Sequence, residues 1–143
     1  MSMLIAALMF IALLAVSVAH FIWSVGQTWP IRNEKLLAQT VAGFRDIERM
    51  PPKLASLAVA IATLLAGILA LALADHDSGG LPLTLLGLPL AAVFLARGAL
   101  GYTAWWADKT PEPSFRFNDR RVYSPLCLML GAGFLTLVIM RLL

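Results

Sequence analysis

The chain has 143 residues, which is enough for one domain. Hydrophobic residues make up 60% of it and charged residues 13%, whereas soluble domains are about half apolar and about a quarter charged. This composition excludes an ordinary soluble domain and indicates that lipid is the solvent for much of the surface. The net charge of +3 is explained by membrane topology, so we expect the lipid bilayer, and no nucleic acid, as a partner.

Four long apolar segments divide the chain, and a membrane-spanning helix needs about 20 such residues. We expect spans over residues 3–25, 54–74, 81–104 and 125–142, within one integral membrane domain over 1–143. The predicted fold class is all-α, a membrane-spanning four-helix bundle. Because no Lys or Arg precedes the first apolar run, we expect a retained span there and not a cleaved signal peptide.

The first loop, residues 26–53, carries a periodic apolar stripe. Asn33 is suited to cap a helix at its start. The three- and four-residue spacing after it predicts an amphipathic helix in the membrane interface, with this stripe: Leu36, Leu37, Thr40, Val41, Phe44 and Ile47. The alternative is an ordered loop packed over the end of the bundle.

The second span has alanines at four-residue steps, Ala58, Ala62, Ala66, Ala70 and Ala74. Small residues on one helix face allow another helix backbone to approach closely in lipid. The span ends in the tight turn Asp75–Gly80. Three adjacent residues, Asp75, His76 and Asp77, do not converge easily on one ion, so we expect no metal site.

The stretch Phe115–Leu128 links the third span to the fourth. It is expected to begin as a charged turn and to enter the last helix at Pro125. In this interpretation Asp119 caps the helix or pairs with a neighbouring Arg. The crowding of charged residues just before an apolar span marks a boundary between water and membrane.

Lys and Arg are distributed unevenly over the connections. Nine lie in or beside the first and third loops, whereas the second loop has none and the C-terminus has only Arg141. Because cytoplasmic loops collect Lys and Arg, we expect loops 26–53 and 105–124 in the cytoplasm and both termini outside. The nine are Arg32, Lys35, Arg45, Arg49, Lys53, Lys109, Arg116, Arg120 and Arg121.

Polar and aromatic side chains gather at the predicted cytoplasmic end. His20 and Trp23 share a face of the first helix, and Arg97 lies near the end of the third. Ionisable groups within spans are functional candidates, although Arg97 is also placed to reach the interface as an anchor and His20 to be a structural histidine. The predicted ligand-binding set is His20, Trp23, Arg97, Trp105, Arg120 and Tyr123.

Three motifs carry a resemblance to a known family: H-x-x-W-x-x-G at His20–Gly26, Met50-Pro51-Pro52, and Y-S-P-L-C at Tyr123–Cys127. Together they resemble a family of small four-span bacterial integral membrane proteins of unknown function. The resemblance covers most of the chain. It implies the four-span fold and a place in the bacterial inner membrane, and it implies no activity or cofactor.

Three functions are compatible with the residues. The first is binding of an amphiphilic small molecule or lipid between the helix ends at the cytoplasmic side. The second is a structural or assembly role, in a homo-oligomer or with a partner membrane protein. The third is a small membrane isomerase or hydrolase in which His20 and Tyr123 exchange protons. No nucleophile turn, phosphate loop or Cys pair favours a particular reaction.

Overall fold

The structure is a computed structural model that describes all residues from Met1 to Leu143. It contains helices and no strand, which confirms the predicted all-α fold. Four helices are long and apolar enough to span a membrane, and they mark the chain as a multi-pass membrane protein. They are α1 (Ser2–Ser24), α3 (Lys53–Ala74), α4 (Gly80–Leu100) and a continuous last helix from Pro113 to Leu142.

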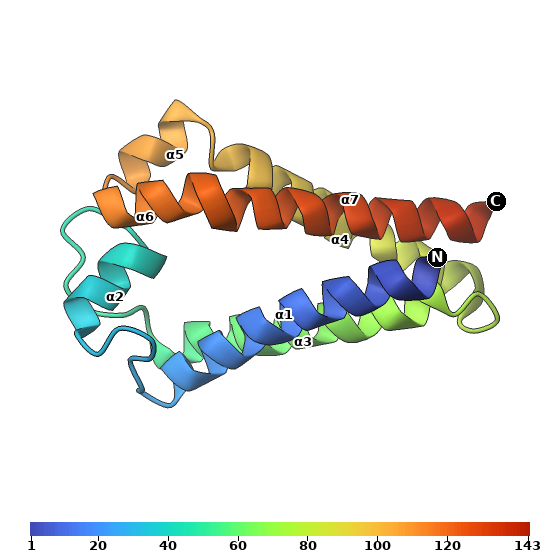
Figure 1. The fold of residues 1–143 in the computed structure, drawn as a ribbon, viewed down its shortest axis with the longest axis horizontal. Helices are drawn as coiled ribbons and strands as arrows, with labels where there is room; N and C mark the ends of the chain where they lie inside the picture. Colours follow the sequence, from blue (N-terminus) through green and yellow to red (C-terminus); the bar gives the residue numbers. More distant parts are fainter.

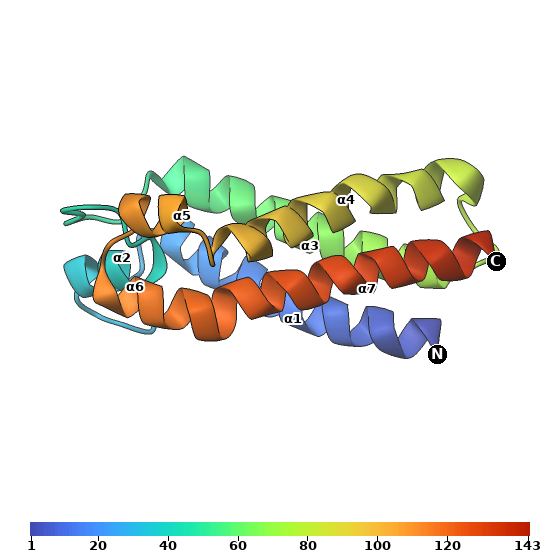
Figure 2. The same cartoon turned by 90° about the horizontal axis from the view of Figure 1, so that it is seen from above.

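The long helices form two pairs, α1 with α3 and α4 with α7 (Ser124–Leu142), as Figure 1 and Figure 2 show. Both chain termini lie at the same end of the bundle as the turn between α3 and α4 (Figure 1). The opposite end, called the loop end here, carries α2 (Glu34–Val41), α5 (Ala104–Lys109) and α6 (Pro113–Asn118). The first and third loops therefore lie at one end, as the alternating connections of four spans require.

The core that joins the two pairs lies toward the chain termini. Phe94 of α4 stacks on Phe134 of α7 beside it, with ring centroids 5.8 Å apart. Toward the loop end the two pairs diverge (Figure 1), and α2 packs against α6 across that end. The core consists of Ala6, Met9, Leu13, Ala66, Ala70, Leu73, Ala74, Ala91, Leu130, Phe134 and Leu137.

Small residues bring α1 and α3 close together. A side chain at Gly67 would meet the Phe10 ring at 2.9 Å, and the Ser17 hydroxyl donates to the Ala60 carbonyl at 2.6 Å. The alanine ladder is buried only in its second half, at Ala66, Ala70 and Ala74, while Ala58 and Ala62 are exposed. Close backbone approach is how helices associate in lipid, and here it holds the first pair together.

The α4–α7 pair is also closely packed. A Cβ atom at Gly98 would lie 2.9 Å from the Leu128 backbone nitrogen, and one at Gly131 would lie 2.8 Å from that of Leu95. Each glycine faces the backbone of the partner helix, so the two backbones lie almost in contact. This approach brings the loop end of α4 against the start of the last helix.

The first two predicted spans agree with α1 and α3 to within one residue at each end, but the later boundaries differ. The third span was expected to reach residue 104, yet α4 ends at Leu100. A short turn follows, and the Thr103 side chain caps α5 by accepting from the Trp106 amide. A new cap therefore starts a separate helix where the apolar run predicted a continuous one.

The last helix begins at Pro113, well before the predicted start at residue 125. The stretch expected to be a charged turn is α6 followed by a π-helical turn, η1 (Asp119–Tyr123), which leads directly into α7. It remains helical because Asp119 is buried and pairs with Arg97 of α4, and so needs no solvated loop.

Helix α2 ends earlier than the helix that the apolar stripe to Ile47 predicted. Its start is as expected, because the Asn33 side chain accepts from the Leu36 amide at 3.1 Å. The helix stops at Val41 because Gly43 has a φ of +69°, and a side chain there would overlap the Phe115 ring. Helix α2 buries Leu37 against the bundle end, which matches the alternative of a packed segment better than a free interfacial helix.

Candidate functional site

The last turns of α1 hold His20 and Trp23 on one face. Their rings are in contact, with centroids 4.7 Å apart. His20 Nδ1 lies 2.9 Å from the Val16 carbonyl. Because a carbonyl only accepts hydrogen bonds, Nδ1 carries the proton, and Nε2 of the neutral ring is an acceptor without a partner in the protein.

An apolar cavity of about 120 Å³ lies beside this pair, between the ends of α1, α2 and α3. Ser56 of α3 is 5% exposed, and its hydroxyl makes no hydrogen bond within the protein. Two other lining residues of α3, Ala55 and Val59, are exposed, so the cavity opens at the helix surface. The lining residues are His20, Trp23, Val41, Ala42, Met50, Pro51, Ala55, Ser56 and Val59.

A second, polar cavity of about 350 Å³ lies on the other side of Trp23, Met50 and Pro51, which line both spaces. It is open toward the first loop. Neither Arg49 nor Lys53 in its wall forms an ion pair. Its remaining lining residues are Gly26, Gln27, Thr28, Glu34 and Pro52.

The turn after α1 shapes this polar cavity. Gly26 has a φ of +89°, and the Lys53 ammonium lies 3.1 Å from where a Gly26 side chain would begin. The Trp23 indole donates to the Trp29 carbonyl at 2.7 Å, which ties the loop back to α1. The H-x-x-W-x-x-G pattern therefore lines both cavities. The rings of His20 and Trp23 border the apolar cavity, and Gly26 leaves space for the Lys53 side chain beside the polar cavity.

A second polar cluster is centred on Asp119, between α4 and the π-helical turn. The Asp119 carboxylate accepts from Arg97 at 2.7 Å, from the Ser124 hydroxyl at 3.1 Å and from the Trp106 indole at 3.1 Å. The Arg116 guanidinium lies 3.8 Å away and completes the cluster. The carboxylate is fully buried, and every partner comes from a different turn of the surrounding helices.

Close packing makes this cluster possible. A side chain at Gly101 would overlap the Ser124 hydroxyl, so glycine allows the end of α4 to approach the carboxylate. The Arg97 guanidinium also lies over the Trp106 ring, 5.1 Å from its centroid. Such a cation–π contact holds the arginine in the orientation that faces Asp119.

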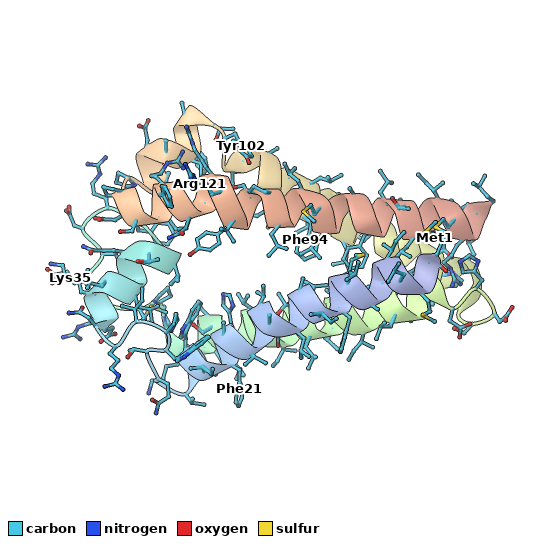
Figure 3. All side chains as sticks on the ribbon, viewed as in Figure 1. Met1, Phe21, Lys35, Phe94, Tyr102 and Arg121 are labelled. Atoms are coloured by element: carbon cyan, nitrogen blue, oxygen red, sulfur yellow. The ribbon has the colours of Figure 1, made fainter.

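The π-helical turn leaves one backbone group without a helical partner. The Ser124 amide bonds to the Asp119 carbonyl five residues back. The next carbonyl, that of Arg120, would need the amide of Pro125, which proline lacks. The Tyr102 hydroxyl donates to it instead, at 3.2 Å. Figure 3 shows Tyr102 beside the beginning of the last helix.

The six residues predicted to bind a ligand lie in several places. His20 and Trp23 line the cavities. Arg97 belongs to the Asp119 cluster, and the Tyr123 hydroxyl donates to the Thr40 carbonyl of α2 at 3.2 Å. Trp105 and Arg120 are exposed at the loop end. The six do not meet in one pocket, and a ligand-binding role for them stays a prediction.

Several important residues were not selected from the sequence. Trp106, Ser124 and Arg116 gather around Asp119, which was expected only to cap a helix or to pair with a neighbouring Arg. The sequence signal for this cluster is that Arg97 lies within a predicted span and needs a carboxylate partner, for which Asp119 is a candidate. Arg49 and Lys53 are predicted from the sequence only as topogenic charges. The cavity that they line depends on how the first loop folds, which the sequence pattern does not indicate.

Comparison with known proteins places the chain in a family. The model of a family described as "Protein of unknown function (DUF3995)" matches residues 13–134. This agrees with the expected resemblance to an uncharacterised family. No curated protein and no solved structure matches the chain.

Proposed function

Because this chain belongs to the DUF3995 family, whose description assigns no activity, we propose a function from its geometry: it binds a membrane amphiphile at the loop end of its bundle. One observation carries the proposal. An apolar cavity and a polar cavity adjoin at Trp23, Met50 and Pro51, which line both. An amphiphile has the same two parts, and a site with separate apolar and polar walls would orient it.

The position of the cavities suits a ligand that stays mostly in lipid. The apolar cavity, at about 120 Å³, holds only a short section of a chain. Its rim at Ala55 and Val59 belongs to the membrane-spanning part of α3 and is exposed. The remainder of the chain would therefore continue into the bilayer, while the polar cavity holds the head.

Arg97 and Arg120 have no part in this proposal. The Arg97 guanidinium is already neutralised by Asp119 at 2.7 Å, and taking it away would leave the buried carboxylate with only the longer Arg116 contact at 3.8 Å. The one hydrogen bond of Arg120 outside its own helix is made by its backbone carbonyl, which accepts from the Tyr102 hydroxyl. The polar groups that are free to meet a ligand are those around Trp23.

The test uses a matched pair of cavity variants. Ala55→Phe puts a ring into the apolar cavity, whereas Ala58→Phe puts the same ring on an exposed part of the same helix. Protein extracted gently from its own membrane is examined by native mass spectrometry. We expect a stoichiometric bound amphiphile in the original chain and in Ala58→Phe, and its loss in Ala55→Phe. The proposal is wrong if the original chain retains none, or if both variants retain it equally.

A further inference from the structure

We infer that the head of the bound amphiphile is a phosphate-type oxyanion held by Arg49 and Lys53. This inference rests on the proposed function and names its ligand class. The polar cavity has three charged side chains in its wall, Glu34, Arg49 and Lys53. The Glu34 carboxylate already accepts from the Met50 amide at 3.2 Å, which ties it to the loop. The two cations are left with no partner.

Only three of the eleven Lys and Arg residues form ion pairs, so what distinguishes Arg49 and Lys53 is that both line one cavity. Lys35 pairs with Glu48 at 3.4 Å, and Arg97 pairs with Asp119 at 2.7 Å. Arg49 and Lys53 face one cavity without any carboxylate in salt-bridge range. Two like charges beside one partly enclosed space favour an anion between them.

The start of α3 adds to this positive potential. Lys53 is the first residue of the helix, and Pro51 and Pro52 precede it without amide hydrogens. A helix of 22 residues carries about half a positive charge at its beginning. The helix start and both cations thus favour an anion in the polar cavity. An Arg guanidinium can donate two parallel hydrogen bonds to two oxygens of one phosphate group, which favours phosphate as that anion.

The groups along α3 also place the parts of such a ligand in order. Ser56 lies one helical turn beyond Lys53 and lines the apolar cavity with a hydroxyl that has no partner. His20 lines the same cavity and has a free acceptor nitrogen. The Ser56 hydroxyl can donate to the ester oxygens that join a phosphate head to its chains, and the His20 acceptor nitrogen can accept from a hydroxyl of the ligand. The chains would follow along Ala55 and Val59.

The experiment compares two lipids that differ only in the phosphate, phosphatidic acid and diacylglycerol with the same chains. Each is added to the full-length protein in detergent, and bound lipid is measured by native mass spectrometry. Losing charged hydrogen bonds of about 1.5 kcal/mol or more corresponds to about tenfold weaker binding. We therefore expect Arg49→Gln/Lys53→Gln to reduce phosphatidic acid binding about tenfold or more, to the diacylglycerol level.

The matched control is Arg32→Gln/Arg45→Gln, which removes the same charge from the same loop but not from the cavity wall. This control and the charge-preserving Arg49→Lys/Lys53→Arg variant should keep the preference for phosphatidic acid. Circular dichroism verifies that each variant is folded. Equal losses in the two Gln variants would assign the effect to overall charge and overturn the inference.

The remaining outcomes separate this inference from the proposed function. If the original chain binds both lipids equally, the phosphate inference is wrong and amphiphile binding stands. If it binds neither, the proposed function itself fails. An inorganic phosphate arm distinguishes the sources: phosphate that binds Arg49 and Lys53 while no lipid is retained would assign the cations to a free anion and overturn the lipid ligand.

Discussion

Arg97 and Asp119 form an ion pair of 2.7 Å that joins α4 to the π-helical turn of the last helix. The carboxylate is fully buried and the guanidinium side chain is 30% exposed. The Ser124 hydroxyl and the Trp106 indole also donate to Asp119. Since polar groups inside a membrane protein must find protein partners, this pair fixes how α4 is positioned against the start of α7.

Replacing Asp119 by Asn should destabilise the protein strongly. It would leave Arg97 and Arg116 facing each other without a carboxylate, and breaking a buried pair costs about 3 kcal/mol or more. The measurement is thermal unfolding in detergent, followed by circular dichroism. The double variant Arg97→Leu/Asp119→Leu should lose less than Asp119→Asn, because it leaves one unpaired cation, Arg116, where Asp119→Asn leaves two cations facing each other. A double variant that is the less stable of the two would contradict this account.

Tyr102→Phe should destabilise the chain only while Pro125 is present. The Tyr102 hydroxyl satisfies the Arg120 carbonyl, which Pro125 leaves without an amide donor. At a partly exposed site the loss should be about 0.5–1 kcal/mol. In a Pro125→Ala background the alanine amide replaces the hydroxyl, so the same substitution should be neutral. Equal effects in both backgrounds, measured by thermal unfolding, would rule out this role for Tyr102.

The parts of the structure predictable from the sequence are those that follow from local patterns. Apolar runs gave the first two spans, and Asn33 was placed correctly as a cap. The three-residue spacing of His20 and Trp23 put their rings together. In each case the determining residues are neighbours along the chain, so periodicity and capping preferences were sufficient.

The remaining features depend on contacts between distant segments. The charged residues around Asp119 favour a loop when read alone, and Pro125 favours a helix start. They are helical because Arg97, 22 positions away in sequence, supplies the charge that Asp119 needs. The cavity around Arg49 and Lys53 likewise requires the first loop to fold back on α1, which no local pattern indicates.

Gly131→Ala and Gly133→Ala should differ although the two glycines are close neighbours in α7. A Cβ atom at Gly131 would lie 2.8 Å from the Leu95 backbone nitrogen, which cannot move without shifting α4. A Cβ atom at Gly133 would meet only the flexible Met9 side chain. We expect a loss of about 1–3 kcal/mol for Gly131→Ala and much less for Gly133→Ala. Similar unfolding temperatures for the two variants would contradict the close approach of α4 and α7.

Arg141→Ala should loosen the end of the bundle opposite the loops. The Arg141 guanidinium donates to the Thr84 hydroxyl at 2.9 Å, to the Leu73 carbonyl at 3.2 Å and to the Ser78 carbonyl at 2.7 Å. Hydrogen bonds from a charged group contribute about 1.5–3 kcal/mol, and partial exposure places this site at the lower limit. Faster amide hydrogen exchange over residues 72–80 would locate the effect. Arg45→Ala, at a cation that forms no ion pair, serves as the control and should leave exchange there unchanged.

The orientation in the membrane follows from the charge distribution and is tested by cysteine labelling. Replacing Cys127 by Ser removes the one native thiol, after which single cysteines are introduced at Asp77 and at Arg45. The nine cations at the loop end predict that position 45 is cytoplasmic and position 77 outside. An impermeant thiol reagent added to intact cells should therefore label position 77 alone. Arg141 is the one Lys or Arg side chain at the opposite end, and its bonds to carbonyls of the α3–α4 turn explain its presence there without a topogenic role.

Labelling of position 45 from outside would reverse the orientation and place the Arg49–Lys53 cavity on the outer face.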